Sequence, residues 1–215
     1  SRVYSIDLLQ SLSLDHSKNA FQLSSSEMLP EGISAAGVSE SASNQAPVSL
    51  YGASKLASES LALEYGHAFE FPVWINRCGV LSGAGQFGRP DQGIFAFWIH
   101  SWRERSALRY IGFGGRGQQV RDVLHPKDLA NLISRQINAG CDRTKPALVN
   151  VSGGIDSAAS LAQVSEWCTA RYGVQAVGEE SDGRVYDLPW IVLECRWARE
   201  TWEWRPEISR EAIFE

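Results

Sequence analysis

Ser49-Leu50-Tyr51-Gly52-Ala53-Ser54-Lys55 is the stretch from which the fold can be argued, because it places a tyrosine and a lysine four residues apart. At that spacing in a helix, two side chains lie on one face and point the same way. Pro47 lies just before the stretch and is typical of the end of an extended segment. The apolar residues that follow at helical spacing are Leu56, Ala57, Leu61, Ala62 and Tyr65. The pattern predicts a helix over 49–69 with Tyr51 and Lys55 in its opening turns.

A tyrosine next to a lysine can serve as a general base. An unperturbed tyrosine has a pKa of about 10 and is a poor base at neutral pH. A neighbouring ammonium favours the phenolate, and the same ammonium can hold a cofactor ribose. Tyr-x-x-x-Lys is also a short pattern that occurs by chance, so an ordinary surface pair remains the alternative for Tyr51 and Lys55.

Composition excludes several classes of protein. The chain has 215 residues, of which 44% are hydrophobic and 21% charged, enough for one sizeable core or two small lobes. Its net charge of −5 argues against a nucleic-acid partner, because backbone binding requires a basic surface. No apolar run approaches the length of a membrane span, and no signal peptide opens the chain. We therefore expect a cytoplasmic protein with no membrane partner.

Cysteines and histidines show no metal-binding spacing. The four histidines are scattered, without cysteine or carboxylate partners at ligand intervals. We expect no metal, and thiols that serve as small core residues. The cysteines are Cys78, Cys141, Cys168 and Cys195.

Helical and extended patterns alternate along the rest of the chain. The serine-rich residues 11–46 predict a long irregular loop with at most short helical turns. The strands that we expect lie at 71–78, 108–111, 118–124 and 147–151. The helices that we expect lie at 94–105, 129–139 and 160–172, the last with a Ser160–Gln163 capping box, and after an N-cap at Ser209. The helix at 49–69 then connects parallel strands.

Two glycine-rich runs imitate phosphate-binding loops. Gly112-Phe113-Gly114-Gly115-Arg116-Gly117 fits G-x-G-x-x-G, but an extended segment follows it instead of a helix, so a turn between strands is predicted. Ser152-Gly153-Gly154-Ile155-Asp156-Ser157 spells the pyrophosphate loop of ATP pyrophosphatases. Few residues remain after it for such a domain, so we keep an ATP-pyrophosphatase-type site only as a lesser alternative to a Gly-Gly turn before a helix.

Several separate stretches occur together in the order of one family. They are Arg2-Val3-Tyr4-Ser5, the loop up to Pro47, Ser49–Lys55 and Gln119–Leu129. In this the chain resembles the extended short-chain dehydrogenases/reductases, specifically the NAD-dependent epimerases and dehydratases of nucleotide sugars. Within that family it looks most like the CDP-tyvelose (CDP-paratose) 2-epimerase branch. The segments that carry this resemblance are Gly85-Gln86-Phe87, Asp91-Gln92-Gly93 and Gly117–His125.

The resemblance implies an α/β fold, with part of a Rossmann-like doubly wound parallel sheet and a smaller α/β substrate-binding lobe. Residues 1–80 and 122–150 would belong to the NAD-binding domain, and 81–121 and 151–215 to the lobe. Dinucleotide folds open with a strand, a glycine-rich turn and a helix, whereas this chain starts with Ser1-Arg2-Val3. We expect that about 100 residues precede it in the parent protein. The family's Ser or Thr, which polarises the substrate hydroxyl, would fall one position before Ser1.

The resemblance also assigns the catalytic and cofactor-binding roles. Bound NAD would take a hydride from a sugar carbon while Tyr51 removes the hydroxyl proton, and the ketone would be reduced again from its other face. Lys55 would bind the nicotinamide ribose and favour the Tyr51 phenolate. Cys78 and Gly79 occupy the position after a strand whose backbone faces the nicotinamide, and a catalytic thiol at Cys78 is the less favoured role.

A second set of residues would bind the nucleotide-diphosphate sugar. Arg121 matches the arginine that grips the diphosphate, with an ion pair to Asp122 or Asp128 as the alternative. Arg184 is a second phosphate candidate, although Glu179-Glu180 stands where relatives often have an arginine. Further pocket candidates are Gln86, Phe87, Asp91 and Gln92, of which Asp91 could equally cap the next helix. That helix carries Phe95, Trp98 and Trp102, which would pack in the core or floor the pocket.

The sequence therefore predicts an NAD-dependent epimerase or dehydratase that acts on a nucleotide-diphosphate sugar by transient oxidation. We expect a homo-oligomer, since the Tyr-Lys helix forms the usual dimer contact in relatives. The alternative is a truncated, non-catalytic binding or assembly module derived from such an enzyme. Whether the 215 residues act alone as an enzyme stays open.

Overall fold

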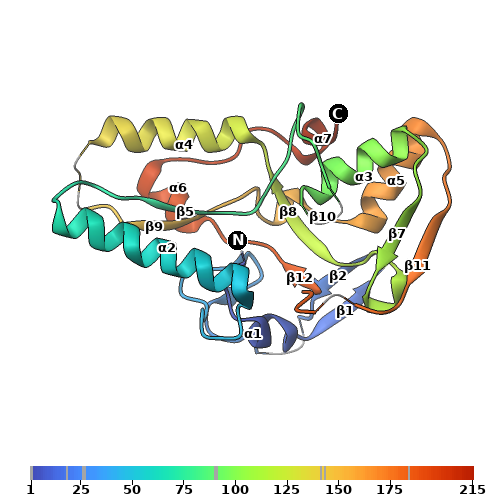
Figure 1. The fold of residues 1–215 in the computed structure, drawn as a ribbon, viewed down its shortest axis with the longest axis horizontal. Coiled ribbons are helices and arrows are strands. Elements are labelled where there is room, and N and C mark those ends of the chain that lie inside the picture. Colours follow the sequence, from blue (N-terminus) through green and yellow to red (C-terminus); the bar gives the residue numbers. More distant parts are fainter. Residues whose placement is uncertain are drawn as a thin grey trace.

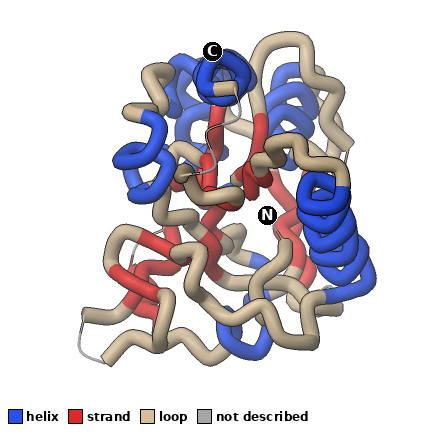
Figure 2. The backbone as a smooth tube through the Cα atoms, turned by 90° about the vertical axis from the view of Figure 1, so that its left-hand side faces the viewer, coloured by secondary structure: helices blue, strands red, loops and turns tan. Residues whose placement is uncertain are grey.

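The structure is a computed structural model that describes residues 2–17, 19–25, 28–89, 92–140, 142, 144–183 and 185–215. It is an α/β fold, in which strands run between helices on both sides (Figure 2). The fold class predicted from the sequence is confirmed. Among the described helices, none combines the length and the hydrophobicity needed to cross a bilayer.

Two parallel strands form one end of the molecule. Strand β5 (Ile75–Cys78) pairs with β9 (Leu148–Val151), with Ile75 opposite Leu148 and Cys78 opposite Val151. Helix α2 (Ser49–Ala68) leads into β5, and α4 (Pro126–Ala139) leads into β9. Figure 1 shows α2 and α4 on opposite sides of this strand pair. Helices on both faces of a parallel sheet are the arrangement expected of a doubly wound fold.

Strand β8 (Val120–Leu124) joins this end of the molecule to the other. It pairs in parallel with β6 (Val80–Leu81) and with β12 (Trp190–Ile191), and antiparallel with β10 (Ala158–Ser160). Its residues alternate between two hydrophobic cores: Val120 and Leu124 belong to one and Val123 to the other. The strand is therefore shared by both halves of the molecule.

The second core fills the end of the molecule that contains β7 (Leu108–Ile111) and β11 (Val177–Glu180), which pair in parallel. Helices α3 (Ile94–Arg103), α5 (Leu161–Tyr172) and α7 (Arg210–Phe214) pack there (Figure 1). The capping box that the sequence predicts is present, since Ser160 Oγ accepts from the Gln163 amide and Gln163 Oε1 accepts from the Ser160 amide. The predicted core role of Phe95, Trp98 and Trp102 is confirmed, because each is 1% exposed.

The prediction of an irregular loop over residues 11–46 is wrong, because this segment forms two small hairpins. Strands β1 (Leu14–Ser17) and β2 (Ala20–Leu23) pair antiparallel, as do β3 (Ile33–Ser34) and β4 (Gly37–Val38). The apolar residues that looked scattered in the sequence are buried ones, including Phe21, Ile33 and Val38. They pack in the first core, and that long-range packing cannot be seen in local composition. The short helix α1 (Ile6–Gln10) precedes these hairpins.

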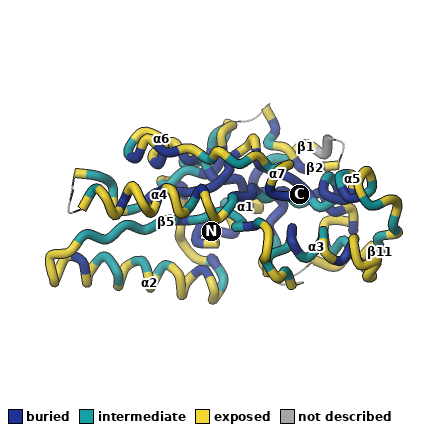
Figure 3. The backbone as a smooth tube through the Cα atoms, turned by 90° about the horizontal axis from the view of Figure 1, so that it is seen from above, coloured by how far each residue is buried: buried dark blue, intermediate teal, exposed yellow. Residues whose placement is uncertain are grey.

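The first core also takes in chain far from the N-terminal half. Helix α6 (Arg196–Trp202) and residues 188–195 pack into it together with β9 and the segment 3–12. Helix α2, by contrast, is exposed or intermediate along most of its length (Figure 3). The division at 81–121 and 151–215 stays a prediction. Cys168 and Cys195 are buried thiols, as expected of small core residues, and Cys141 lies outside the described residues.

We expect Trp98→Ala to destabilise the protein by about 3–5 kcal/mol, because the buried indole would leave a cavity. Its ring stacks on Tyr110 with centroids 5.1 Å apart, and Nε1 donates to Ser165 Oγ at 2.9 Å. Urea denaturation measures the loss. Trp197 is the matched control, since it is 41% exposed and its change to alanine should cost no more than about 0.5 kcal/mol. Equal losses at the two tryptophans would contradict the assigned core.

Candidate active site

Tyr51 and Lys55 lie in the opening turns of α2 with their side chains together. The Lys55 Nζ atom lies 5.4 Å from the centroid of the Tyr51 ring, within the range of a cation–π contact. Both side chains are exposed, Tyr51 to 59%. In the described part of the chain, neither the Tyr51 hydroxyl nor the Lys55 ammonium has a hydrogen-bond partner. The predicted pairing on one helix face is confirmed, and both polar groups are available to a ligand.

Helix α2 packs on the rest of the protein through little of its own surface. Only Gly52 and Gly66 are buried along its 20 residues, and Leu56 packs partly on the first core. A Cβ at Gly52 would lie 2.3 Å from the carbonyl oxygen of Arg2. The absence of a side chain at Gly52 therefore lets the turn that carries Tyr51 touch the segment 2–5.

A buried ion pair holds the middle of α2. Arg77 Nε and Nη2 donate to the two carboxylate oxygens of Glu59 at 3.0 and 2.7 Å. The side chains are 5% and 14% exposed, and the Arg77 guanidinium lies over the Tyr4 ring at 5.2 Å. Burial lowers the pKa of Arg77, but the hydrogen bonds to Glu59 and Tyr4 outweigh it and raise the pKa overall. Arg77 is therefore a fixed cation between α2 and β5.

This ion pair continues into a chain of buried hydrogen bonds. The Tyr4 hydroxyl donates to Asn150 Oδ1 at 2.5 Å, and burial raises the pKa of Tyr4 to about 12. Asn150 Nδ2 donates to the carbonyl of Val38 at 2.9 Å, and its backbone N–H donates to Glu40 Oε1 at 2.7 Å. The network joins α2, β5, β9, β4 and the first residues of the chain.

Sequence reasoning missed this network. One signal was present, because Glu59 follows Lys55 by four residues on the face already singled out. Its partner lies 18 residues further on and Asn150 lies 146 residues from Tyr4, so the pairings depend on the fold.

Cys78 and Gly79 end strand β5. The Gly79 N–H donates to the carbonyl of Val151 at 3.0 Å, and a Cβ at Gly79 would lie 1.9 Å from Ser152 Oγ. Burial raises the pKa of the Cys78 thiol, which disfavours the thiolate that a nucleophile requires. A backbone contact between these residues and a nicotinamide stays a prediction.

Arg121 is largely buried and ion-paired, but not to either predicted partner. Its Nη2 lies 3.4 Å from Asp187 Oδ1 and donates to the carbonyl of Leu188 at 2.8 Å. Burial lowers the pKa of Arg121 to about 10, and the positive charge of Arg2 also lowers it. The Asp187 carboxylate opposes this lowering, and the charge of Arg2, from the segment that touches α2, adds to it.

Asp122 and Asp128 have other partners, so the alternative ion pair proposed for Arg121 from the sequence is wrong in its partner. Asp122 Oδ2 accepts from the Leu193 N–H at 2.8 Å, and burial raises the pKa of this carboxyl. Asp128 accepts from the N–H groups of Glu207 and Ile208, each at 3.2 Å. The reason is strand alternation: neighbours such as Arg121 and Asp122 point to opposite faces of β8.

The other substrate candidates lie in the connection between β6 and α3. Gln86 Nε2 donates to the carbonyl of Leu81 at 3.0 Å, while its Oε1 is buried without a partner in the described part of the chain. Phe87 is 95% exposed, and Gln92 is exposed and bonded through its backbone to Arg89. The residue at the N-cap of α3 is Gly93. Asp91 and Arg184 lie outside the described residues.

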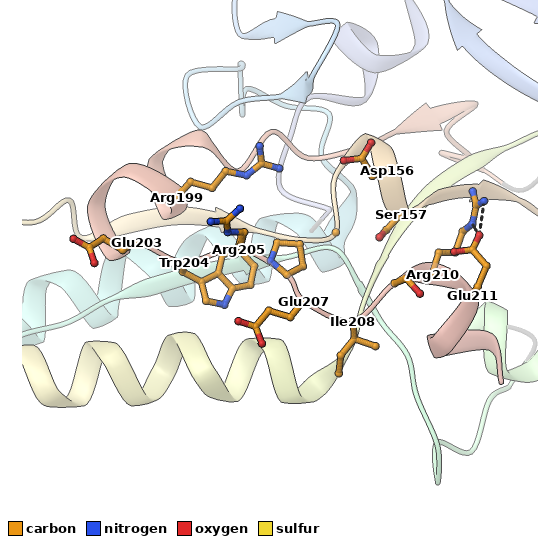
Figure 4. A pocket seen from close by; sticks show the side chains of 13 residues that line it. Asp156, Ser157, Arg199, Glu203, Trp204, Arg205, Glu207, Ile208, Arg210 and Glu211 are labelled. Atoms are coloured by element: carbon orange, nitrogen blue, oxygen red, sulfur yellow. Dashed lines mark hydrogen bonds and ion pairs between the residues drawn. The ribbon is translucent and has the colours of Figure 1, made fainter.

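A hollow of about 720 Å³ lies elsewhere, between the turn 153–157, the end of α6 and the start of α7 (Figure 4). Its charged side chains are of both signs and include Arg199, Glu203, Glu207 and Asp156. Among the described residues, those predicted to bind NAD or the nucleotide sugar do not line it, whereas Gly153, Asp156 and Ser157 of the glycine-rich run do. The turn continues into β10, and α5 begins only at Leu161, so the turn does not lead directly into a helix as a pyrophosphate loop does. This arrangement does not support an ATP-pyrophosphatase-type site.

Metal ligands do not gather in the described residues, where no three His, Cys, Asp or Glu side chains come together as they would around an ion. Residues 2–152 match the model of the NAD dependent epimerase/dehydratase family. The chain belongs to this family.

Two relatives have names that identify them as nucleotide-sugar epimerases. The chain is 28% identical to a CDP-paratose 2-epimerase of Salmonella typhi over 74% of its own length and 47% of the relative's. It is also 28% identical to a UDP-glucuronate 4-epimerase of Thermodesulfobacterium geofontis, over 77% and 48%. The chain thus spans about half the length of these curated relatives.

Solved structures share the fold. MoeE5 in complex with UDP-glucose and NAD superposes with a TM-score of 0.71 and 23% identity, over 86% of this chain and 60% of that one. UDP-glucuronic acid 4-epimerase from Bacillus cereus, in complex with UDP-glucuronic acid and NAD, gives 0.69 and 22%, over 86% and 56%. The predicted recognition as an NAD-dependent epimerase/dehydratase family member is confirmed.

The hydrogen-bond network generates a prediction about pH. Burial raises the pKa of Glu40, and the nearby Glu194 carboxylate adds to this. The folded protein then binds a proton at Glu40 more tightly than the unfolded chain, so this group makes the free energy of unfolding fall as the pH rises from about 4 through the raised value. Glu40→Gln keeps an oxygen for the Asn150 N–H and removes that loss.

We therefore expect the stability gain of Glu40→Gln over the wild type to be larger at pH 7 than at pH 4. Thermal unfolding at both pH values measures it. Glu200→Gln, at an exposed position of α6, is the matched control and should show no such difference. A gain that grows toward low pH would reverse the assigned sign.

Proposed function

We propose that this chain is the part of an NAD-dependent nucleotide-sugar epimerase that supplies the general base, with Tyr51 in that role. The observation that carries the proposal is the exposed Tyr51–Lys55 pair, whose hydroxyl and ammonium have no partner within the described protein. A general base must be open to its substrate, and the exposure of this pair meets that requirement. Membership in the epimerase/dehydratase family supports the same role.

The residues present fit an NAD ribose. An ammonium and a phenolic hydroxyl side by side can donate to and accept from a ribose diol, and here both are exposed and adjacent. Gly79, the residue after β5, packs too closely against Ser152 to carry a side chain, and its backbone carbonyl remains our candidate for a nicotinamide contact. The cofactor would supply the hydride acceptor for transient oxidation of the sugar. In the neighbours named above, the structures contain NAD.

The protein's own contribution is the proton and its placement. Tyr51 as phenolate removes the proton from the sugar hydroxyl that is oxidised, and it returns a proton to the oxygen when the carbonyl is reduced from the other face. Lys55 lies beside Tyr51 and holds the ribose, so one residue orients cofactor and base together. Proton and hydride are both returned, and the sugar changes only in configuration.

The substrate that we propose is a nucleotide-diphosphate sugar. Arg121 would bind the diphosphate through its planar fork of donors, after exchanging Asp187 for phosphate oxygens. The influence of Arg2 on Arg121 supports a positive site that an anion would relieve. Gln86, with its unsatisfied Oε1, and the exposed Phe87 and Gln92 remain candidates for sugar contacts, as do Asp91 and Arg184.

Self-association of the parent protein belongs to the same proposal. Helix α2 exposes an apolar set that a second copy could cover, which supports the homo-oligomer expected from the sequence. The members of the set are Leu50, Leu61, Tyr65 and Phe69, each more than half exposed. A cytoplasmic location stays a prediction.

We expect Tyr51→Phe in the full-length enzyme to lower kcat by about 10²–10⁴-fold, which is the contribution of general-base catalysis. Tyr65→Phe is the matched control, since Tyr65 lies on the same helix and is 58% exposed, against 59% for Tyr51. Turnover of UDP- and CDP-sugars is followed by product analysis, with circular dichroism to check folding. A Tyr51→Phe enzyme that keeps its kcat would refute the proposed base.

We expect Arg121→Gln to weaken nucleotide-diphosphate binding about ten- to a hundredfold, the loss of a hydrogen bond to a charged group. Asp187→Asn should strengthen nucleotide-diphosphate binding or leave it unchanged, because this change frees Arg121 from the Asp187 carboxylate. Titration of UDP and CDP by calorimetry measures both affinities. Binding that is unchanged in Arg121→Gln would remove Arg121 from the diphosphate site.

A further inference from the structure

Three side chains stand in one row along α2. Tyr51, Lys55 and Glu59 follow each other at intervals of four residues, so each is the helical neighbour of the next. Lys55 can therefore contact either the aromatic ring of Tyr51 on one side or the carboxylate of Glu59 on the other. On an isolated helix, a lysine and a glutamate at this spacing attract each other and form an ion pair.

The structure shows that the expected ion pair is not made. Lys55 extends toward Tyr51, with its Nζ atom 5.4 Å from the ring centroid. Glu59 turns inward instead, and both of its oxygens accept from Arg77 at 3.0 and 2.7 Å. The Lys55 ammonium is left without a carboxylate within the described chain and lies beside the Tyr51 ring.

Arg77 outcompetes Lys55 for Glu59 for three physical reasons. Its planar fork makes two hydrogen bonds to one carboxylate, which a lysine cannot do. It is only 5% exposed, so its attraction to Glu59 is weakly screened by water. It is also fixed in place by β5 and by the Tyr4 ring at 5.2 Å, so little side-chain entropy is lost on pairing.

We propose that Arg77 is a positioning residue that sequesters the Glu59 carboxylate and thereby keeps the Lys55 ammonium free for Tyr51 and the cofactor ribose. The statement about what Lys55 is freed for rests on the proposed function; the competition for Glu59 does not. Removing Arg77 while keeping Glu59 would release a carboxylate next to Lys55. Lys55 would then form an ion pair with Glu59 and leave its contact with the Tyr51 ring.

The experiment measures the reactivity of the Lys55 amine in the 215-residue chain. An amine that is held as an ammonium by a carboxylate acetylates more slowly than a free one. The chain has only four lysines, and peptide mass spectrometry after limited acetylation follows each of them. Lys127, on α4 and exposed, is the internal reference, so the result is a ratio of rates within one sample.

We expect Arg77→Met to lower the Lys55 to Lys127 ratio about two- to fivefold, in line with a partly exposed ion pair. The double variant Arg77→Met/Glu59→Gln should restore the wild-type ratio, because the competing carboxylate is gone. Glu59→Gln alone should leave the ratio unchanged. Arg109→Met is the matched control, since Arg109 is an exposed arginine paired to Glu180 on β11 and far from this row in the sequence. It should also leave the ratio unchanged.

Circular dichroism shows whether each variant folds. If Arg77→Met does not fold, Arg77→Lys takes its place, because it keeps a buried cation but cannot bind both oxygens; a smaller drop is expected, again reversed by Glu59→Gln. A ratio that stays constant, or a drop that Glu59→Gln does not reverse, would overturn the proposal, since a purely stabilising role predicts no such rescue.

The test does not depend on catalytic turnover. A full-length Tyr51→Phe enzyme that stays active would refute the proposed function and leave this result standing.

Discussion

The guanidinium of Arg77 is a charge that the fold has buried, and the elements around it are arranged to satisfy it. An unpaired buried charge is very costly, so the carboxylate of Glu59 must stay within reach and α2 must stay against β5. The Tyr4 ring covers the same guanidinium, and the Tyr4 hydroxyl passes the constraint on to Asn150 in β9. A helix of 20 residues that buries only two glycines is thereby held in a defined position.

The alternation of β8 sets the second part of the site. Val120 and Leu124 belong to one core and Val123 to the other, so the strand lies at the boundary between the two. Arg121 is placed on the opposite face from Asp122, where it meets Asp187 and the charge of Arg2. The candidate diphosphate arginine therefore lies near the segment that touches the Tyr51 turn. Packing in the two cores holds β8 in place, and the position of β8 in turn determines where the Arg121 guanidinium lies.

The sequence predicts correctly those features that depend on residues close together in the chain. Helix 49–69 and the Ser160–Gln163 capping box could be found because both depend on residues within one or two turns. The hairpins within 11–46 could not, because their apolar residues acquire a partner only when the core forms. Asp187 lies 66 residues from Arg121, and nothing in the sequence ranks it above the adjacent Asp122. The long-range pairings are what the sequence leaves unspecified.

A buried ion pair is weak evidence for stability, since desolvation of both charges offsets much of their attraction and apolar residues of similar size often do as well. Stability alone therefore does not account for Glu59 and Arg77. A residue without charge at position 59 would leave Lys55 equally free; with a glutamate there, Arg77 is the residue that holds the carboxylate away from the lysine four residues earlier. Glu59 thus has two acceptable cations, and the fold supplies the buried one. The selectivity of that pairing, more than its strength, connects the core of this protein to the chemistry available at its surface.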